Sequence, residues 1–208
     1  MAKLPQPTPA APAAGADPTP PTKAEVEQLV AELKAARQAL TELNFAEAKP
    51  HLARAAALAK VPSHREAAAR LQELAAHAER FQSAIAEAVQ GLKSGESFRV
   101  GTSTEVAFVE APPGKVTLRV GGMNRTYPIA ELPAGLALAL ADLKLPPSDP
   151  ATKLAKGAYL ALHKVPDPAA KARDEEKAKA LWKEAASEGA DAARLEAALA
   201  DNYDSLMK

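Results

Sequence analysis

The sequence predicts a mostly helical α+β protein, in which antiparallel helical hairpins or a helical bundle flank a small central antiparallel β-meander. Alanine, the strongest helix former, makes up about a quarter of the 208 residues. Apolar residues recur at intervals of three and four up to residue 94 and again from residue 147 on, which is typical of amphipathic helices. Between these parts, in residues 95–131, the period shortens to two, which is typical of strands. A meander of this size is compatible with an SH3-like fold or an open barrel.

Changes in composition and period divide the chain into five segments. These are a proline- and alanine-rich leader, a three-helix unit, the meander, a short covering helix with its linker, and a C-terminal helical unit: residues 1–21, 22–94, 95–131, 132–146 and 147–208. The leader has too few apolar residues for a core, so we expect it to be disordered. It lacks the apolar run of a secretory signal, which leaves a plain tail and a tether to an upstream anchor as alternatives. We expect a cytoplasmic protein by default, and an envelope-tethered or exported form if an upstream anchor exists.

The first two helices have recognisable start signals. Thr22 and Glu25 in "TKAE" form a capping box, in which each side chain bonds the backbone N–H of the other residue. This helix should stop near Asn44, which can cap a second helix starting at Phe45. Pro50 lies within the second helix and either kinks it or marks a later start.

The third helix is the longest of the chain. "SHRE", Ser63 to Glu66, predicts a second capping box, and Ser94 with Gly95 predicts the end of the helix. Its apolar residues alternate spacings of four and three over about four heptads, as in coiled coils: Ala67, Leu71, Leu74, Ala78, Phe81, Ile85, Ala88 and Leu92. We expect the first two helices to pack on this 67–92 seam within the chain, with self-association through the seam as the alternative.

Four short strands follow, and their alternation places apolar residues together on one face of each strand: Phe98 and Val100, then Val106 and Phe108, then Val116, Leu118 and Val120. A loop over Gly121–Asn124 would place Leu118 opposite Tyr127 and Val116 opposite Ile129. We prefer this register to a tight Gly–Gly turn, because it pairs apolar residues with apolar residues. Pro128 cannot donate to a β-ladder, so the last strand should lie at an edge.

The remaining segments read as helices. A short buried helix after Pro133 should cover the sheet or dock it against the helical body. Three more helical segments follow the "LPPSDP" linker. The second of these should end at Gly189, and the last should run from about Asp191 to Leu206.

Two stretches resemble known helical-hairpin repeats. "ALTELNFAEAKPHLARAAALA", residues 39–59, resembles the turn and second helix of a tetratricopeptide repeat, with Phe45, Ala48 and Ala55 at the matching positions. "KALWKEAASEGADAARLEAAL", residues 179–199, resembles a Sel1-like repeat in its small residues: Ala185, Ala186, Gly189 and Ala193. Each stretch covers about one repeat. The resemblance implies helical hairpins that mediate protein interactions without catalysis.

The layout as a whole resembles a planctomycete-type group of proteins with a proline-rich leader, an "nF..A...L..A" hairpin and a central meander ending in "LP". That resemblance implies no particular activity.

The residues that usually carry chemistry do not cluster. The chain has no cysteine, which excludes disulfides and thiolate sites, and no phosphate-loop, dinucleotide-binding or serine-elbow motif. No two of its four histidines stand at metal-ligand spacing. We expect Glu73 and His77 to form a solvated pair, and the acidic run of residues 174–176 to lie on a charge-compensated solvated face. The sequence therefore predicts no catalytic residues, cofactor or metal, and no enzyme.

One surface is a candidate for interaction, namely the polar face of the meander. Its candidate residues are Arg99, Arg119, Arg125 and Tyr127. Glutamates of the same segment (residues 96, 105 and 110) should pair with the arginines across strands. Lys+Arg and Asp+Glu both total 26, so there is no clear nucleic-acid signature, and no apolar run is long enough to span a membrane. We expect a scaffold or adaptor for an unknown protein partner; the alternative is a module that binds a peptide or nucleic acid through this face.

Overall fold

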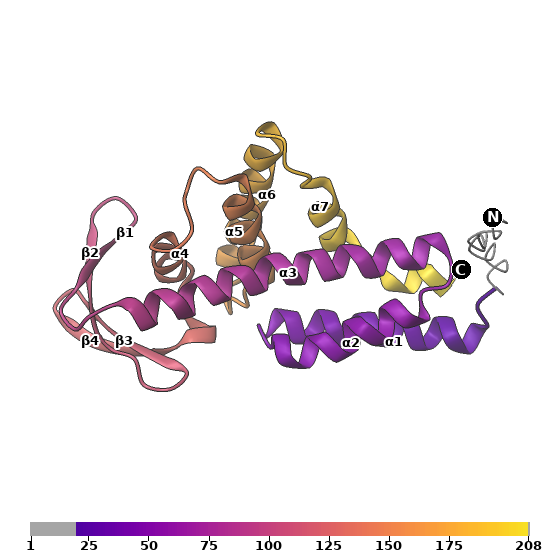
Figure 1. Ribbon diagram of the computed structural model, residues 1–208, viewed down its shortest axis with the longest axis horizontal. Coiled ribbons are helices and arrows are strands. Elements are labelled where there is room, and N and C mark those ends of the chain that lie inside the picture. Colours follow the sequence, from indigo (N-terminus) through magenta and orange to yellow (C-terminus); the bar gives the residue numbers. More distant parts are fainter. Residues whose placement is uncertain (1–19, 208) are drawn as a thin grey trace, which may run out of the picture.

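The computed structural model describes residues 20–207, so the leader predicted for residues 1–21 lies almost entirely outside the described residues. Residues 20–207 form seven α-helices, two short 3₁₀ helices and four strands. The strands make one antiparallel sheet in the order β1-β2-β3-β4, which does not close into a barrel. The predicted fold class is confirmed, and Figure 1 shows the long helix α3 running from the other helices to the sheet.

Helices α1 (Lys23–Thr41) and α2 (Phe45–Leu58) form an antiparallel hairpin. Both predicted caps are confirmed. Thr22 Oγ1 accepts from the Glu25 N–H while Glu25 Oε2 accepts from the Thr22 N–H, and Asn44 Oδ1 accepts from the Glu47 N–H. Pro50 lies inside α2 without ending it. Between the helices the chain turns at Leu43, whose φ is 53°.

Helix α3 (Pro62–Gly91) is the axis on which α1, α2, α4, α5 and α7 pack. It begins at Pro62 and its N-cap, Val61, makes no side-chain hydrogen bond, so the capping box predicted at Ser63 is wrong. Proline suits the first turn of a helix, because its N–H would have no helical partner there. The helix also ends at Gly91, short of Ser94. All residues of the 67–92 seam except Leu92 are buried within this chain, by α1 and α2 as predicted and also by α4, α5 and α7.

Strands β1 (Ser97–Val100), β2 (Thr104–Glu110), β3 (Lys115–Val120) and β4 (Met123–Pro128) form the predicted meander, with β4 at an edge. The predicted register of the last hairpin is wrong. Val116 lies opposite Tyr127, Leu118 lies opposite Arg125, and Ile129 lies beyond the strand. Gly121 and Gly122 both have positive φ, 57° and 82°. Since glycine adopts this conformation without steric cost, a two-residue turn that matches the strand twist prevails over the apolar pairing.

Helix α4 (Ala134–Asp142) follows the 3₁₀ turn Ile129–Glu131 and contacts both β1 and α3, so it docks the sheet onto the helical body. Helices α5 (Pro150–Leu162) and α6 (Pro168–Ser187) form a second antiparallel hairpin, whose fully buried Trp182 donates from Nε1 to the Leu154 carbonyl at 3.2 Å. Gly189, with a φ of 94°, follows α6 as predicted.

The C-terminal segment is not the single helix predicted from Asp191 to Leu206. Helix α7 (Ala193–Ala200) stops, and a 3₁₀ helix (Tyr203–Met207) follows. Between them Asp201 leaves helical geometry and accepts two hydrogen bonds from the Arg70 guanidinium of α3, at 3.0 and 2.6 Å. Charge-assisted hydrogen bonds of this kind are strong, which explains the break. Among residues 20–207, no helix combines the length and the apolar character needed to cross a lipid bilayer.

Candidate functional sites

The sheet places the four candidate residues of the meander on two different faces. Residues directly opposite each other in an antiparallel pair point to the same side. Arg125 is opposite Leu118 and Tyr127 is opposite Val116, so both share the face of the buried apolar residues. Arg119 lies on the other face, which the strand alternation also gives to Arg99. The expectation that all four residues share one polar face is therefore wrong.

The charges of the meander also do not pair as expected. Among residues 20–207, no ion pair involves Glu96, Glu105 or Glu110. Arg119 Nε donates instead to Asn124 Oδ1 at 3.0 Å. Glu96 accepts from the Lys93 N–H, also at 3.0 Å, and so fixes the turn into β1. The predicted cross-strand ion pairs are absent from this part of the chain.

Two further polar groups have other roles than predicted. Glu73 Oε2 lies 3.2 Å from Arg194 Nε and so joins α3 to the start of α7. His77 is half-buried, and burial followed by the nearby Arg80 charge lowers its pKa. The predicted solvated Glu73–His77 pair is therefore wrong. Asp174 is not fully solvated either, because its Oδ2 lies 3.6 Å from Nδ1 of the buried His163.

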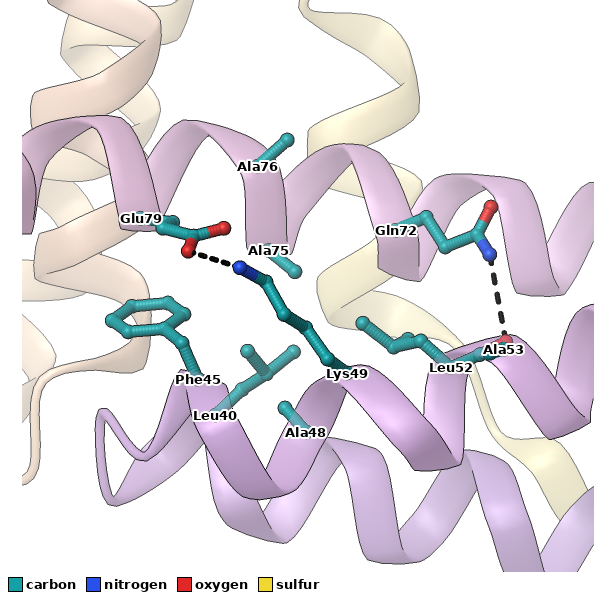
Figure 2. A pocket seen from close by; sticks show the side chains of 10 residues that line it. All are labelled: Leu40, Phe45, Ala48, Lys49, Leu52, Ala53, Gln72, Ala75, Ala76 and Glu79. Atoms are coloured by element: carbon teal, nitrogen blue, oxygen red, sulfur yellow. Dashed lines mark hydrogen bonds and ion pairs between the residues drawn. The ribbon is translucent and has the colours of Figure 1, made fainter.

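A groove lies between α2 and α3, with a cavity volume of about 260 Å³ (Figure 2). We call it the α2–α3 groove, and its lining residues are Leu40, Phe45, Ala48, Lys49, Leu52, Ala53, Gln72, Ala75, Ala76 and Glu79. Four of them are alanines, whose side chains end at Cβ and so leave space between the helices. The lining is otherwise mostly apolar, with a partly buried phenylalanine at one end.

The polar groups of the α2–α3 groove are paired with one another. Lys49 reaches across from α2, and its Nζ lies 2.6 Å from Glu79 Oε1 on α3 (Figure 2). Gln72 Nε2 donates to the Leu52 carbonyl at 3.4 Å. Because the two charges compensate each other, the groove presents apolar surface with no net charge.

A larger cavity, of about 660 Å³, lies where three segments of the chain meet. We call it the junction cavity. It is lined by the α1–α2 turn, the connection from β4 to α4, and the connection from α5 to α6: Thr41, Glu42, Leu43, Ala130, Glu131, Pro133, His163, Lys164, Val165 and Pro166. Its volume falls in the range of small-molecule sites.

The His163 wall of the junction cavity rests on a stack of aromatic rings. The imidazole stacks on Tyr159 with ring centroids 5.0 Å apart, and Tyr159 stacks on Phe81 of α3 at 4.3 Å. The Tyr159 hydroxyl donates to the Leu132 carbonyl at 3.3 Å. Burial raises the pKa of this phenol, with a smaller contribution from the Asp174 charge. These contacts fix the position of the histidine.

Two charged side chains of α6, Lys171 and Asp174, contact His163 behind that wall. Lys171 Nζ donates to the carbonyls of Ala161 and His163, at 2.6 and 3.1 Å, and so closes the C-terminal end of α5. Burial lowers the pKa of His163, opposed by Asp174, and burial also lowers the pKa of Lys171, opposed by Glu175 and Asp174. His163 is therefore a neutral ring at neutral pH.

The sequence reasoning did not single out the junction cavity. Its three segments are separated by tens of residues, and none carries a motif. Within residues 20–207, no group of three or more His, Cys, Asp or Glu side chains is placed to hold a metal ion. Comparison of the chain with protein-family models, curated proteins and solved structures found no match. The resemblance to helical-hairpin repeats stays a prediction.

Proposed function

We propose that this protein is a non-enzymatic scaffold or adaptor, and that the α2–α3 groove receives apolar side chains of a protein partner. The observation that carries the proposal is the apolar, charge-compensated groove between α2 and α3. Two antiparallel hairpins, α1–α2 and α5–α6, pack on the single long helix α3 and give the groove a rigid frame.

An amphipathic helix is the partner that this surface fits best. Small exposed residues continue along α2 beside the groove: Ala46, Pro50, Ala53, Ala56 and Ala57. Small residues let a second helix approach closely, and amphipathic helices commonly bind by placing apolar side chains in such grooves. A cavity of about 260 Å³ accepts one large apolar side chain. Full burial of such a side chain contributes roughly 1.5–3 kcal/mol.

The test uses two matched alanine variants of α2. Ala53 lines the groove, whereas Ala57 is exposed one helical turn later and does not line it. Ala53→Glu places a carboxylate where the partner needs apolar surface, and Ala57→Glu introduces the same charge on the same helix. Immobilised parent chain and both variants are incubated with extract of the cells that produce the protein, and the retained proteins are identified by mass spectrometry.

The proposal predicts one protein that the parent and Ala57→Glu retain and Ala53→Glu loses. That protein, once purified, should shift the amide NMR signals of residues 45–53 and 72–79. If every retained protein binds all three chains equally, or if the shifts fall outside these residues, the groove is not the binding surface. Both alanines are exposed, so circular dichroism should show that both variants fold like the parent.

A further inference from the structure

We propose that the junction cavity is a second binding site, which takes a small organic ammonium ion with an apolar body. This site is separate from the α2–α3 groove and shares no lining residue with it. It lies where three parts of the fold meet. One lining segment comes from the α1–α2 hairpin, one from the exit of the meander and one from the α5–α6 hairpin.

The apolar part of the lining sets the character of the ligand body. Leucine, alanine, valine and two prolines supply it: Leu43, Ala130, Pro133, Val165 and Pro166. Small-molecule sites typically combine such walls with a few polar groups that fix orientation, in volumes of roughly 300–1,000 Å³. At about 660 Å³ the junction cavity accommodates a ligand of the size of a phenylalkylamine.

The polar groups of the cavity favour a cation. Glu42 and Glu131 contribute two carboxylates from different segments, and Lys164 contributes one ammonium group. No ion pair within residues 20–207 involves any of these three side chains. The lining therefore has an excess of one negative charge, and both carboxylates have acceptor capacity for an N–H donor.

His163 adds a neutral polar group to the same wall. It is only 7% exposed, and its Nδ1 is buried without a hydrogen-bond partner. Asp174 Oδ2 is 3.6 Å from this nitrogen, just beyond hydrogen-bonding distance. Burial lowers the pKa of His163 and so favours the uncharged ring, which adds no repulsion to an ammonium ligand.

The turn that carries Leu43 gives the cavity a fixed wall. Leu43 has a φ of 53°, and its side chain is buried. Its N–H donates to the Leu40 carbonyl at 3.0 Å, and the Asn44 N–H donates to the Ala39 carbonyl at 2.9 Å, which are the two hydrogen bonds of the Schellman motif that ends α1.

The test titrates the ¹⁵N-labelled full chain with phenethylammonium and, separately, with 3-phenylpropionate, its anionic counterpart of similar size. Phenethylammonium should shift the amide signals of residues 41–43, 130–131 and 163–165 with a saturable curve. 3-Phenylpropionate should bind more weakly at the same residues. The α2–α3 groove should not respond, so failure here is distinguishable from failure of the proposed function.

Charge variants test the assignment further. Glu42→Gln and Glu131→Gln should each weaken phenethylammonium binding by roughly twofold to fivefold, and Lys164→Gln should strengthen it by a similar factor, as expected for exposed charges. Glu110→Gln, at an exposed position of β2 outside the cavity, is the matched control and should leave binding unchanged. Equal or tighter binding of 3-phenylpropionate, shifts confined to other residues, or no effect of the three variants would each overturn the proposal.

Discussion

Substitution of Gly157 by alanine should destabilise the protein, although the same change usually stabilises a helix. Gly157 lies inside α5, and a Cβ added there would lie 2.2 Å from Nε1 of Trp182, 2.6 Å from Cδ1 and 2.8 Å from Cε2. The indole is fully buried and donates to the Leu154 carbonyl, so any movement away from an added Cβ disturbs the core and strains this hydrogen bond. The α5–α6 hairpin therefore depends on the absence of a side chain at this position.

The magnitude follows from three opposing effects. Alanine gains about 1 kcal/mol over glycine in a helix interior. Overpacking of a filled core costs about 1–3 kcal/mol. If the indole shifts enough to lose its hydrogen bond, a buried donor without a partner costs about 1–3 kcal/mol more. With that hydrogen bond lost, the three effects leave a net loss of roughly 1–5 kcal/mol in the free energy of unfolding.

Urea denaturation measures this loss, followed by circular dichroism and by fluorescence of the chain's one tryptophan. Gly135→Ala is the matched control, because its added Cβ would lie 3.6 Å from Val100 Cγ1, an ordinary contact. Gly91→Ala is a second control, since the nearest atom is the flexible Lys144 Nζ at 3.4 Å. Both controls should be neutral or stabilising by up to about 1 kcal/mol. A Gly157→Ala variant as stable as these controls would refute the packing described for α5 and α6.

Three further predictions concern other parts of the structure. Asp201→Ala should lower the free energy of unfolding by about 1–3 kcal/mol in urea denaturation, because it leaves the half-buried Arg70 guanidinium without its bidentate acceptor; an unchanged midpoint would contradict this link. Gly122→Ala should cost about 1–2 kcal/mol by the same assay, since alanine is strained at a φ of 82°, and a stability equal to the parent's would count against the tight turn. Burial lowers the pKa of His163 in the folded state, so unfolding takes up a proton as pH falls below the unfolded value of about 6.5. The stability that the neutral ring contributes is therefore complete above that pH and is lost below it. In the His163→Phe variant the urea midpoint should fall less between pH 7 and pH 5 than in the parent. An equally large fall in both proteins would contradict this role of His163.

Local signals in the sequence were enough to predict most of the architecture. The capping box at Thr22 and the cap at Asn44 depend on residues three apart, so they are readable without the fold. The heptad spacing of α3 identified its buried face for the same reason, and the change of period to two identified the four strands. Phe45 and Ala48, which carry the resemblance to a tetratricopeptide repeat, both line the α2–α3 groove.

Choices between competing local signals were harder to predict. Two glycines allowed a tight turn as well as a longer loop, and only the backbone conformation decides which residues of β3 and β4 face each other. Serine and proline both mark helix starts, and at Pro62 and Ser63 the proline determined the start. The end of α7 depends on Arg70, which is 131 residues away from Asp201 in the chain.

The junction cavity depends on tertiary structure throughout. Tyr159 lies four residues before His163 on α5, but the contact between His163 and Asp174 forms only when α5 and α6 pack together. Glu42 and Glu131 are brought together by the packing of the α1–α2 turn against the exit of the meander. A positive φ at Leu43 has no signature in a sequence, because leucine rarely adopts it.

Photo-cross-linking from the α2–α3 groove tests the functional account most directly. A photoreactive phenylalanine analogue replaces Ala53 in one chain and Ala57 in another, and both chains are irradiated in extract of the cells that produce the protein. The account predicts one discrete cross-linked partner from position 53, which is absent from position 57 and is suppressed by excess parent chain. The same products from both positions, or no partner from position 53, would contradict the groove as the binding surface.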